Sequence, residues 1–250
     1  MHLRSAALLL LASPLLAADW PRFRGPEGLG TAADKNIPVA FTPKDYHWKT
    51  PIPGKGNSSP IVSNGKVFLQ TASEDGAKRM LVCVDAVSGK IDWAKETRGG
   101  PARTHAKNSL ASSTPAADGR HVYAVFWNGK TISLTAWDFA GKELWAKDLG
   151  GFVSQHGPGL SPIIVGDKVI LNVDQDDLAE VIAFDAKTGD QVWKKSRQAF
   201  RASYTTPFVW TRDGKPSIVV GSTAGVTAYD PADGAVVWNW TWVWKPAAKG

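Results

Sequence analysis

Polar and ionisable side chains gather in four stretches that do not resemble one another. The stretches are GKGNSS (54–59), RTHAKNS (103–109), SQHGPG (154–159) and FRASYTT (200–206). Their ammonium, guanidinium, imidazole, amide and phenol groups are suited to holding a ligand by hydrogen bonds and charge. The candidate binding residues are Lys55, Asn57, His105, Lys107, Asn108, Gln155, His156, Arg201 and Tyr204. The alternative is that these groups bond neighbouring parts of the protein and line a water-filled channel.

The acidic run Asp174-Gln175-Asp176-Asp177 adds Asp174 to the candidate binding residues. Paired carboxylates at this spacing suggest calcium, but a calcium loop also needs a following Gly and a distant Glu. Both are missing from the run, so we predict no metal site. The alternative interpretation of the run is a solvated turn.

The sequence contains no motif of an established catalytic centre. It has no G-x-S-x-G, no H-E-x-x-H, no cysteine pair for zinc and no phosphate-cradling Gly loop. Cys83 is the only cysteine and lies in an apolar run, which predicts a small core residue and excludes an intrachain disulfide. We therefore predict no catalytic residue.

A repeated motif provides the scaffold that must position these groups. AFDAKTGDQVW (183–193) returns as CVDAVSGKIDW (83–93), AYDPADGAVVW (228–238) and, one residue shorter, AWDFAGKELW (136–145). The Asp carboxylate can accept turn N–H groups, Gly permits φ > 0, and Trp offers a flat apolar face that can wedge between sheets. The predicted docking residues are Trp48, Asp85, Gly89, Trp93, Asp138, Gly141, Trp145, Asp185, Gly189, Trp193, Asp230, Gly234 and Trp238.

A second landmark is a hydroxyl residue before proline, which precedes a short apolar strand in each repeat. An Asn/Asp–Gly type of turn follows each time, and this is a strong hairpin signal. The third repeat then reads as four antiparallel strands, with a first strand that proline opens without losing a ladder bond. The four pairs are Ser59-Pro60, Thr114-Pro115, Ser161-Pro162 and Thr206-Pro207.

The spacing of the tryptophans predicts how these sheets are arranged. Trp48, Trp93, Trp145, Trp193 and Trp238 follow one another at 45 to 52 residues. Four strands per repeat at this period indicate the blades of an all-β propeller, whereas a β-sandwich would not explain the regular Trp. Loops that lead into the innermost strands emerge on one face near the axis. We therefore expect the four polar stretches to converge there on one pocket.

The AxDxxTGxxxW pattern of residues 183–193 resembles the Trp-docking repeat of the pyrroloquinoline-quinone (PQQ) propeller family. This family includes quinoprotein alcohol dehydrogenases and the non-catalytic BamB-type assembly lipoprotein. The segment DWPRFRGP looks like the N-terminus of secreted bacterial PQQ-like repeat proteins. The resemblance implies a ring of seven or eight blades, of which about four fit into residues 48–250. A closed ring of four blades is the alternative.

The resemblance also implies an alternative activity, the oxidation of alcohols or sugars with PQQ and calcium. The alcohol dehydrogenases of the family carry an adjacent cysteine pair, which a single Cys83 cannot supply. Sugar-oxidising relatives lack that pair, so a PQQ-dependent dehydrogenase stays as the alternative. The leading hypothesis is a non-catalytic binding or scaffold module without a cofactor, which uses its loops for a protein or a small ligand.

The N-terminus indicates export. Residues 1–17 combine Arg4, the apolar run Ala6–Ala12 and a small-residue end, which is typical of a secretory signal and too short to span a bilayer. Residues 18–47 read as an extended arm anchored by Trp20 and Phe23. We expect a location in the periplasm, at the cell surface or outside the cell. The net charge of +6 is spread thinly, which argues against nucleic-acid binding.

Overall fold

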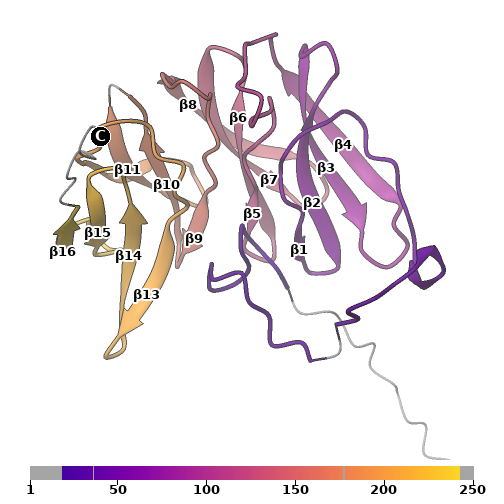
Figure 1. The fold of residues 1–250 in the computed structure, drawn as a ribbon, viewed down its shortest axis with the longest axis horizontal. Helices are drawn as coiled ribbons and strands as arrows, with labels where there is room; N and C mark the ends of the chain where they lie inside the picture. Colours follow the sequence, from indigo (N-terminus) through magenta and orange to yellow (C-terminus); the bar gives the residue numbers. More distant parts are fainter. Residues whose placement is uncertain (1–18, 36, 177, 243–250) are drawn as a thin grey trace, which may run out of the picture.

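The short-strand repeats fold into four separate antiparallel sheets. The computed structural model describes residues 19–35, 37–176 and 178–242. Within these residues every sheet has four strands in chain order, and the one helical element is the 3₁₀ turn η1 (Pro43–Asp45). Figure 1 shows the sheets standing side by side like the blades of a propeller. The predicted all-β propeller fold with about four blades is confirmed.

Each blade corresponds to one sequence repeat, and the four are called blades 1 to 4. Blade 1 comprises β1 (Ile61–Ser63), β2 (Lys66–Ala72), β3 (Lys78–Asp85) and β4 (Ile91–Arg98). Blade 2 comprises β5 (Ala116–Ala117), β6 (His121–Trp127), β7 (Thr131–Asp138) and β8 (Glu143–Gly151). Blade 3 comprises β9 (Ile163–Val165), β10 (Lys168–Asp174), β11 (Ala179–Asp185) and β12 (Gln191–Ser196). Blade 4 comprises β13 (Phe208–Arg212), β14 (Lys215–Gly221), β15 (Gly225–Tyr229) and β16 (Val236–Thr241).

The turn between the third and fourth strand of each blade owes its shape to the Asp of the repeat. In blade 3, Asp185 Oδ1 accepts the backbone N–H groups of Lys187 and Thr188 at 2.9 and 2.8 Å. Gly189 then adopts φ +72°, a conformation that a residue with a Cβ rarely enters. The carboxylate and the glycine together fold the chain back into β12.

The Trp of the repeat locks each blade to the next one. The Trp145 indole of blade 2 lies against Gly189 of blade 3, and its Nε1 donates to the Ala186 carbonyl at 3.0 Å. Trp93 makes the same contact with blade 2 and Trp193 with blade 4, through carbonyls of Phe139 and Pro231. The locks work because Gly leaves room for a large apolar ring that also finds a hydrogen-bond acceptor.

Three buried clusters fill the spaces between consecutive blades. Phe68 and Cys83 of blade 1 pack on Val122 and Phe126 of blade 2, and similar clusters join blades 2 to 3 and 3 to 4. Cys83 is a buried core residue, as predicted. Among the described residues no cluster joins blade 4 to blade 1. The four blades therefore form an open arc, and they do not close into a ring of four.

The hydroxyl–proline landmarks lie at the innermost edge of the arc. Each first strand begins one residue after the proline, so the proline precedes the strand and does not occupy its first position. The hydroxyl residues connect blades: Thr114 Oγ1 accepts the Ser59 N–H at 3.2 Å, and Ser161 Oγ accepts the Thr114 N–H at 3.0 Å. These bonds tie the hub together where backbone N–H groups would otherwise lack partners.

The chain before blade 1 differs in part from the prediction. We expected a strand ahead of Trp48, but the short η1 turn stands there, and Trp48 belongs to no strand. In the arm, Trp20 pairs with Val62 of β1. The most buried side chain of the arm is Arg22, which is 7% exposed, whereas Phe23 is half-buried. An arginine anchors the arm because its guanidinium donates to the carbonyls of Pro26 and Pro207.

The C-terminal tryptophans also differ from the first interpretation, in which their alternation marked the start of another strand. Trp240 lies inside β16, the last strand of blade 4. Trp244 falls outside the residues that the structure describes, and so does the predicted signal segment 1–17.

Candidate functional site

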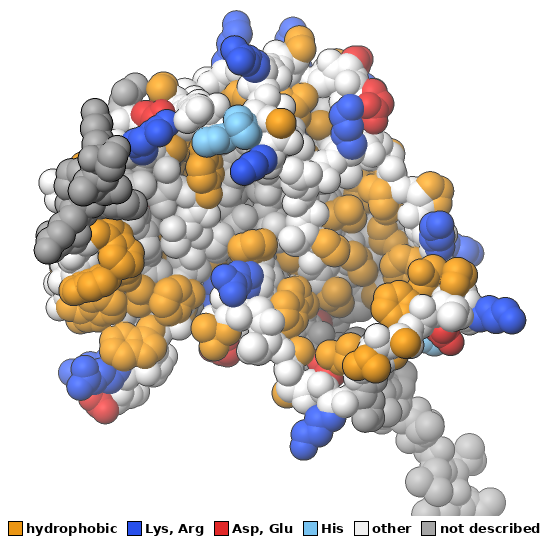
Figure 2. All heavy atoms as spheres, in the orientation of Figure 1, with side chains coloured by type: hydrophobic (Ala, Val, Ile, Leu, Met, Phe, Trp, Pro, Cys, Tyr) orange, Lys and Arg blue, Asp and Glu red, His pale blue; other side chains and the backbone are white. Residues whose placement is uncertain are grey.

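The four polar stretches lie at one end of the arc, which is here called the loop face. They lead into β1, β5, β9 and β13, and they emerge on the side opposite the β1–β2 type of turn. Two adjoining cavities of about 410 and 240 Å³ open there, and they share His156 and Tyr204. Figure 2 shows the histidines and several Lys and Arg side chains on this side of the molecule, at the top.

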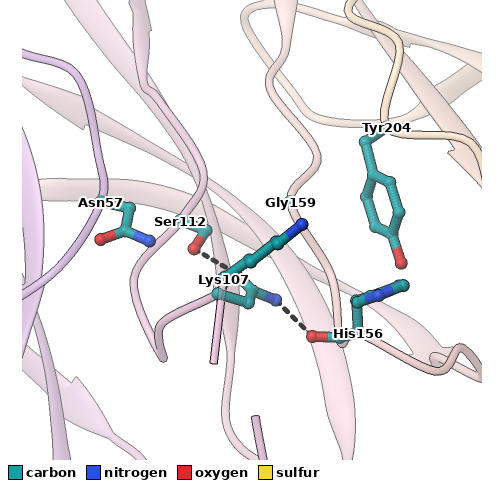
Figure 3. A pocket seen from close by; sticks show the side chains of 7 residues that line it. Asn57, Lys107, Ser112, His156, Gly159 and Tyr204 are labelled. Carbon is teal, nitrogen blue, oxygen red and sulfur yellow. Dashed lines mark hydrogen bonds between the residues drawn. The ribbon is translucent and has the colours of Figure 1, made fainter. Parts of the chain in front are cut away.

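The larger cavity draws its lining from the loops before blades 2, 3 and 4 and from Asn57. Figure 3 shows Asn57 and Tyr204 on opposite sides, with Ser112, Lys107 and His156 between them. The lining residues are Asn57, Lys107, Asn108, Ser112, His156, Gly159 and Tyr204. Side chains that are far apart in the sequence therefore meet at one hollow, as the sequence predicted.

Asn108 organises the floor of the larger cavity. Its Nδ2 donates to the His156 carbonyl at 2.6 Å and to the Pro158 carbonyl at 3.3 Å. Its Oδ1 accepts the Ser109 N–H at 2.8 Å and the Ser112 hydroxyl. Because one amide joins the loop before blade 2 to the loop before blade 3, Asn108 positions its neighbours more than it offers itself to a ligand.

Three rings form a cluster between the two cavities. The centroids of His105 and His156 are 4.3 Å apart with the ring planes at 70°, and Tyr204 meets His156 edge-on at 6.1 Å. The Tyr204 hydroxyl donates to Ser154 Oγ at 3.2 Å. The mutual packing holds the rings in place, while Tyr204 stays 42% exposed and so can contact a ligand.

The smaller cavity has a guanidinium at its rim. Arg201 Nη2 donates to Gln155 Oε1 at 2.8 Å, and Asp176 Oδ1 accepts the Ala202 N–H at 2.8 Å. Among the described residues, neither Arg201 nor Lys107 takes part in an ion pair. Two cations without carboxylate partners, beside imidazoles and amides, make this surface suited to polar ligands that carry negative charge.

Two predicted binding residues do not line either cavity. Lys55 forms an exposed ion pair with Glu74 and pairs through its backbone with Ala72. Asp174 is fully buried, 3.6 Å from Arg197 Nε, and accepts a hydrogen bond from Asn172 Nδ2 at 3.3 Å. Burial raises the pKa of Asp174 to about 6, although Arg197 and the Asn172 amide act in the opposite direction. Placing Asp174 on the binding face was wrong, because the strand β10 continues through it into the core.

Sequence reasoning missed Ser112 and Gly159, which also line the larger cavity. Gly159 has no side chain to signal a role. Ser112 stands two residues before the Thr114-Pro115 landmark, and this proximity to the hub was the available signal. Arg79 was missed as well: it is buried, and its guanidinium donates only to backbone carbonyls, those of Trp127, Gly76, Lys78 and Gly100.

The donor set for calcium and PQQ does not fit the described residues. No group of three or more His, Cys, Asp or Glu side chains is placed to hold a metal ion in this part of the chain. The candidate carboxylate Asp174 is already engaged by Arg197 in the interior, and Asp176 bonds the backbone of Ala202. We therefore derive no chemical step through a quinone at these positions.

Comparison with known families follows from this geometry. The family described as "Outer membrane protein assembly factor BamB", built of PQQ-like repeats, matches residues 32–135 and 106–242. Together the two matches run over most of the chain. The chain belongs to this family. Membership in the PQQ-like repeat family agrees with the blades and the Trp locks. No curated protein matches the sequence.

Solved structures share the fold of this PQQ-like propeller at low identity. A europium-containing methanol dehydrogenase is 15% identical with a TM-score of 0.55, over 79% of this chain and 45% of that one. The quinohemoprotein alcohol dehydrogenase of Pseudomonas putida HK5 is 20% identical with a TM-score of 0.50, over 73% and 34%. BamB from Moraxella catarrhalis is 16% identical with a TM-score of 0.44, over 76% and 63%. The chain thus spans less than half the length of these two dehydrogenases.

The PQQ-like repeat family is also characterised here by its strands alone. Within residues 19–242, apart from the two undescribed positions, no helix is long and apolar enough to cross a bilayer.

Proposed function

We propose that this PQQ-like propeller is an exported, non-catalytic binding module whose loop face takes a protein segment or a small polar ligand. The observation that carries the proposal is the pair of adjoining cavities that meet at His156 and Tyr204. Function on variable loops above a repeated scaffold is the usual arrangement in such folds. Export is supported by the signal-like residues 1–17.

The chemistry of the cavities favours binding over catalysis. Asn108 and Gln155 spend their side chains on neighbouring loops, and Arg201 is held by Gln155. A general base needs a titratable group within reach of a substrate proton, ordinarily supported by a third group. The two histidines face each other instead, and the nearby carboxylate of Asp174 is buried against Arg197.

Ligand capture tests this proposal. The protein is immobilised and exposed to extracts of the cell envelope, and bound components are quantified by mass spectrometry. A His156→Ala/Tyr204→Ala variant should lose at least one component about tenfold or more, a typical effect of removing central contact residues. Lys187→Ala is the matched control, because Lys187 is exposed in the turn of blade 3 at the opposite end. Equal recovery with all three proteins would contradict a binding role for the loop face.

The second candidate is a PQQ-dependent dehydrogenase, and it is favoured by the fold shared with the two dehydrogenases above. Its test adds PQQ and calcium to the purified protein and follows dye-coupled oxidation of alcohols and sugars. Turnover with a defined stoichiometry of bound quinone would replace the binding proposal. An absence of both quinone binding and turnover is the expected result.

A further inference from the structure

Blade 4 ends the arc with a tryptophan that has no lock. Trp238 occupies the position of Trp93, Trp145 and Trp193, each of which donates its Nε1 to a carbonyl of the following blade. Trp238 Nε1 is buried and has no hydrogen-bond partner among the described residues. A buried N–H without an acceptor costs about 1–3 kcal/mol. The Trp238 indole is therefore a donor in need of an acceptor.

The strand that carries Trp238 also departs from its sister strands. Two residues after the Trp, blades 1 to 3 have Lys95, Lys147 and Lys195, whereas blade 4 has Trp240. Lys147 reaches the next blade and pairs with Asp190 at 3.0 Å.

The result is an exposed apolar surface on the last blade. Val236, Trp240 and Trp210 are 60%, 57% and 40% exposed, and Trp210 packs edge-on against Trp238 with centroids 6.0 Å apart. Figure 2 shows hydrophobic side chains gathered over β13–β16 at the left. An apolar patch on an uncharged edge strand is typical of an interaction surface.

The polarity of the stack defines what this surface fits. Every blade presents its Trp to the next blade and receives a Trp at its own Gly turn on the opposite face. The receiving face of blade 1 is covered by the chain itself: Ile52 packs on Met80, Val82 and Val84. Trp48 lies against Gly89 and donates to the Ala86 carbonyl at 3.0 Å. One end of the arc is thus capped, and the other is not.

Trp48 holds its position less firmly than the tryptophans inside the arc. It belongs to no strand and is 37% exposed, whereas Trp193 lies in β12 and is 6% exposed. A strand Trp is anchored by its ladder bonds, and Trp48 lacks them. A competing indole that arrives on a rigid blade can therefore replace it.

We propose that the Trp238 face is a docking surface for a second copy of this chain, joined head to tail. Trp238 of one copy takes the place of Trp48 on Gly89 and Ala86 of the other. The spacing of the acceptor supports this pairing, since Ala86 precedes Gly89 by three residues, as Ala186 precedes Gly189. Each chain therefore carries both halves of the lock, and the contact is heterologous: two different surfaces meet.

Sedimentation equilibrium of the purified chain and its variants tests the docking. The wild type should self-associate weakly. Trp48→Ala frees the receiving face and should lower the dissociation constant about tenfold or more, whereas Trp238→Ala should raise it by at least as much. The double variant should behave like Trp238→Ala, which separates specific docking from aggregation of an uncapped blade. Trp240→Ser, a change at an exposed ring, should weaken association as well and serves if Trp238→Ala does not fold.

Three results would overturn the proposal. The first is a monomer at about 100 µM for both the wild type and Trp48→Ala. The second is loss of association in Trp238→Ala with no change in Trp48→Ala, which would mean that two copies meet through blade 4 alone. The third is undiminished association of the double variant. None of these readings depends on the loop face, so ligand capture by that face stands or falls separately.

Discussion

The indole of Trp145 lies so close to Gly189 that a Cβ on the glycine would come within 2.7 Å of the ring. The same glycine adopts φ +72°. Gly189→Ala therefore adds two costs, a left-handed backbone of about 1–2 kcal/mol and overpacking of about 1–3 kcal/mol. We expect the free energy of unfolding to fall by about 2–4 kcal/mol in urea titrations.

Gly214→Ala is the matched control for the Trp145 lock. Gly214 adopts φ +73°, but a Cβ there would meet nothing within 4 Å. Only the backbone cost of about 1–2 kcal/mol should remain. Equal losses in the two variants would show that the indole contact does not constrain Gly189.

The repeat and its turns were readable from the sequence because they depend on local chemistry. The Asp–Gly turn before Trp193 and the hydroxyl–proline landmarks place all four blades correctly. The role of Arg22 was not readable, since its acceptor at Pro207 is 185 residues away and no local pattern announces it. Asp174 was misplaced for a related reason: an acidic run looks solvated until the fold brings Arg197 against it.

The loop face followed from topology, and its details did not. The convergence of Asn57, His156 and Tyr204 could be predicted because loops that lead into inner strands share one end of a propeller. The division of labour could not be predicted, since only the folded contacts show that Asn108 bonds the loop of His156 while Tyr204 stays exposed.

Asn108→Ala should loosen the floor of the larger cavity. The change removes donors to the His156 and Pro158 carbonyls and an acceptor for Ser109 and Ser112. We expect unfolding free energy to drop by about 1–3 kcal/mol. Asn57→Ala, at an exposed side chain of the same cavity, should change it by less than about 0.5 kcal/mol. Thermal melts of both variants provide the comparison, and similar melting temperatures would argue against the bridging role.

Stability should depend on pH through Asp174. Its pKa is raised to about 6 in the fold, mainly by burial, above the value of about 4 expected when unfolded. Between these values the folded state holds a proton that the unfolded state has released, so this contribution to stability is present below about pH 4 and is lost as the pH rises towards 6. The loss amounts to at most about 3 kcal/mol.

Asp174→Asn removes that titration. The difference in unfolding free energy between wild type and variant should shift in favour of the variant as the pH rises from about 4 to about 6. Carboxyl groups with lowered pKa values, such as Asp118, contribute equally to both proteins and cancel in the difference. A constant difference across this window, measured by urea titration, would mean that Asp174 ionises normally.

The arm should detach when Arg22 is truncated. The buried guanidinium donates from Nε to the Pro26 carbonyl at 3.0 Å and from Nη1 to the Pro207 carbonyl at 3.2 Å, so it ties the arm to blade 4. The neighbouring arm residues bond blades 1 and 2, because the Trp20 N–H donates to Val62 and the Ala117 N–H donates to Pro21. Arg22→Ala should therefore speed amide hydrogen exchange at Trp20 and Ala117 by about tenfold or more, as local opening costs less free energy. Arg24→Ala is the control on the same arm, since Arg24 is exposed and donates only locally, to the Leu29 carbonyl. Unchanged exchange at Trp20 in Arg22→Ala would show that the strand pairing holds the arm without the guanidinium.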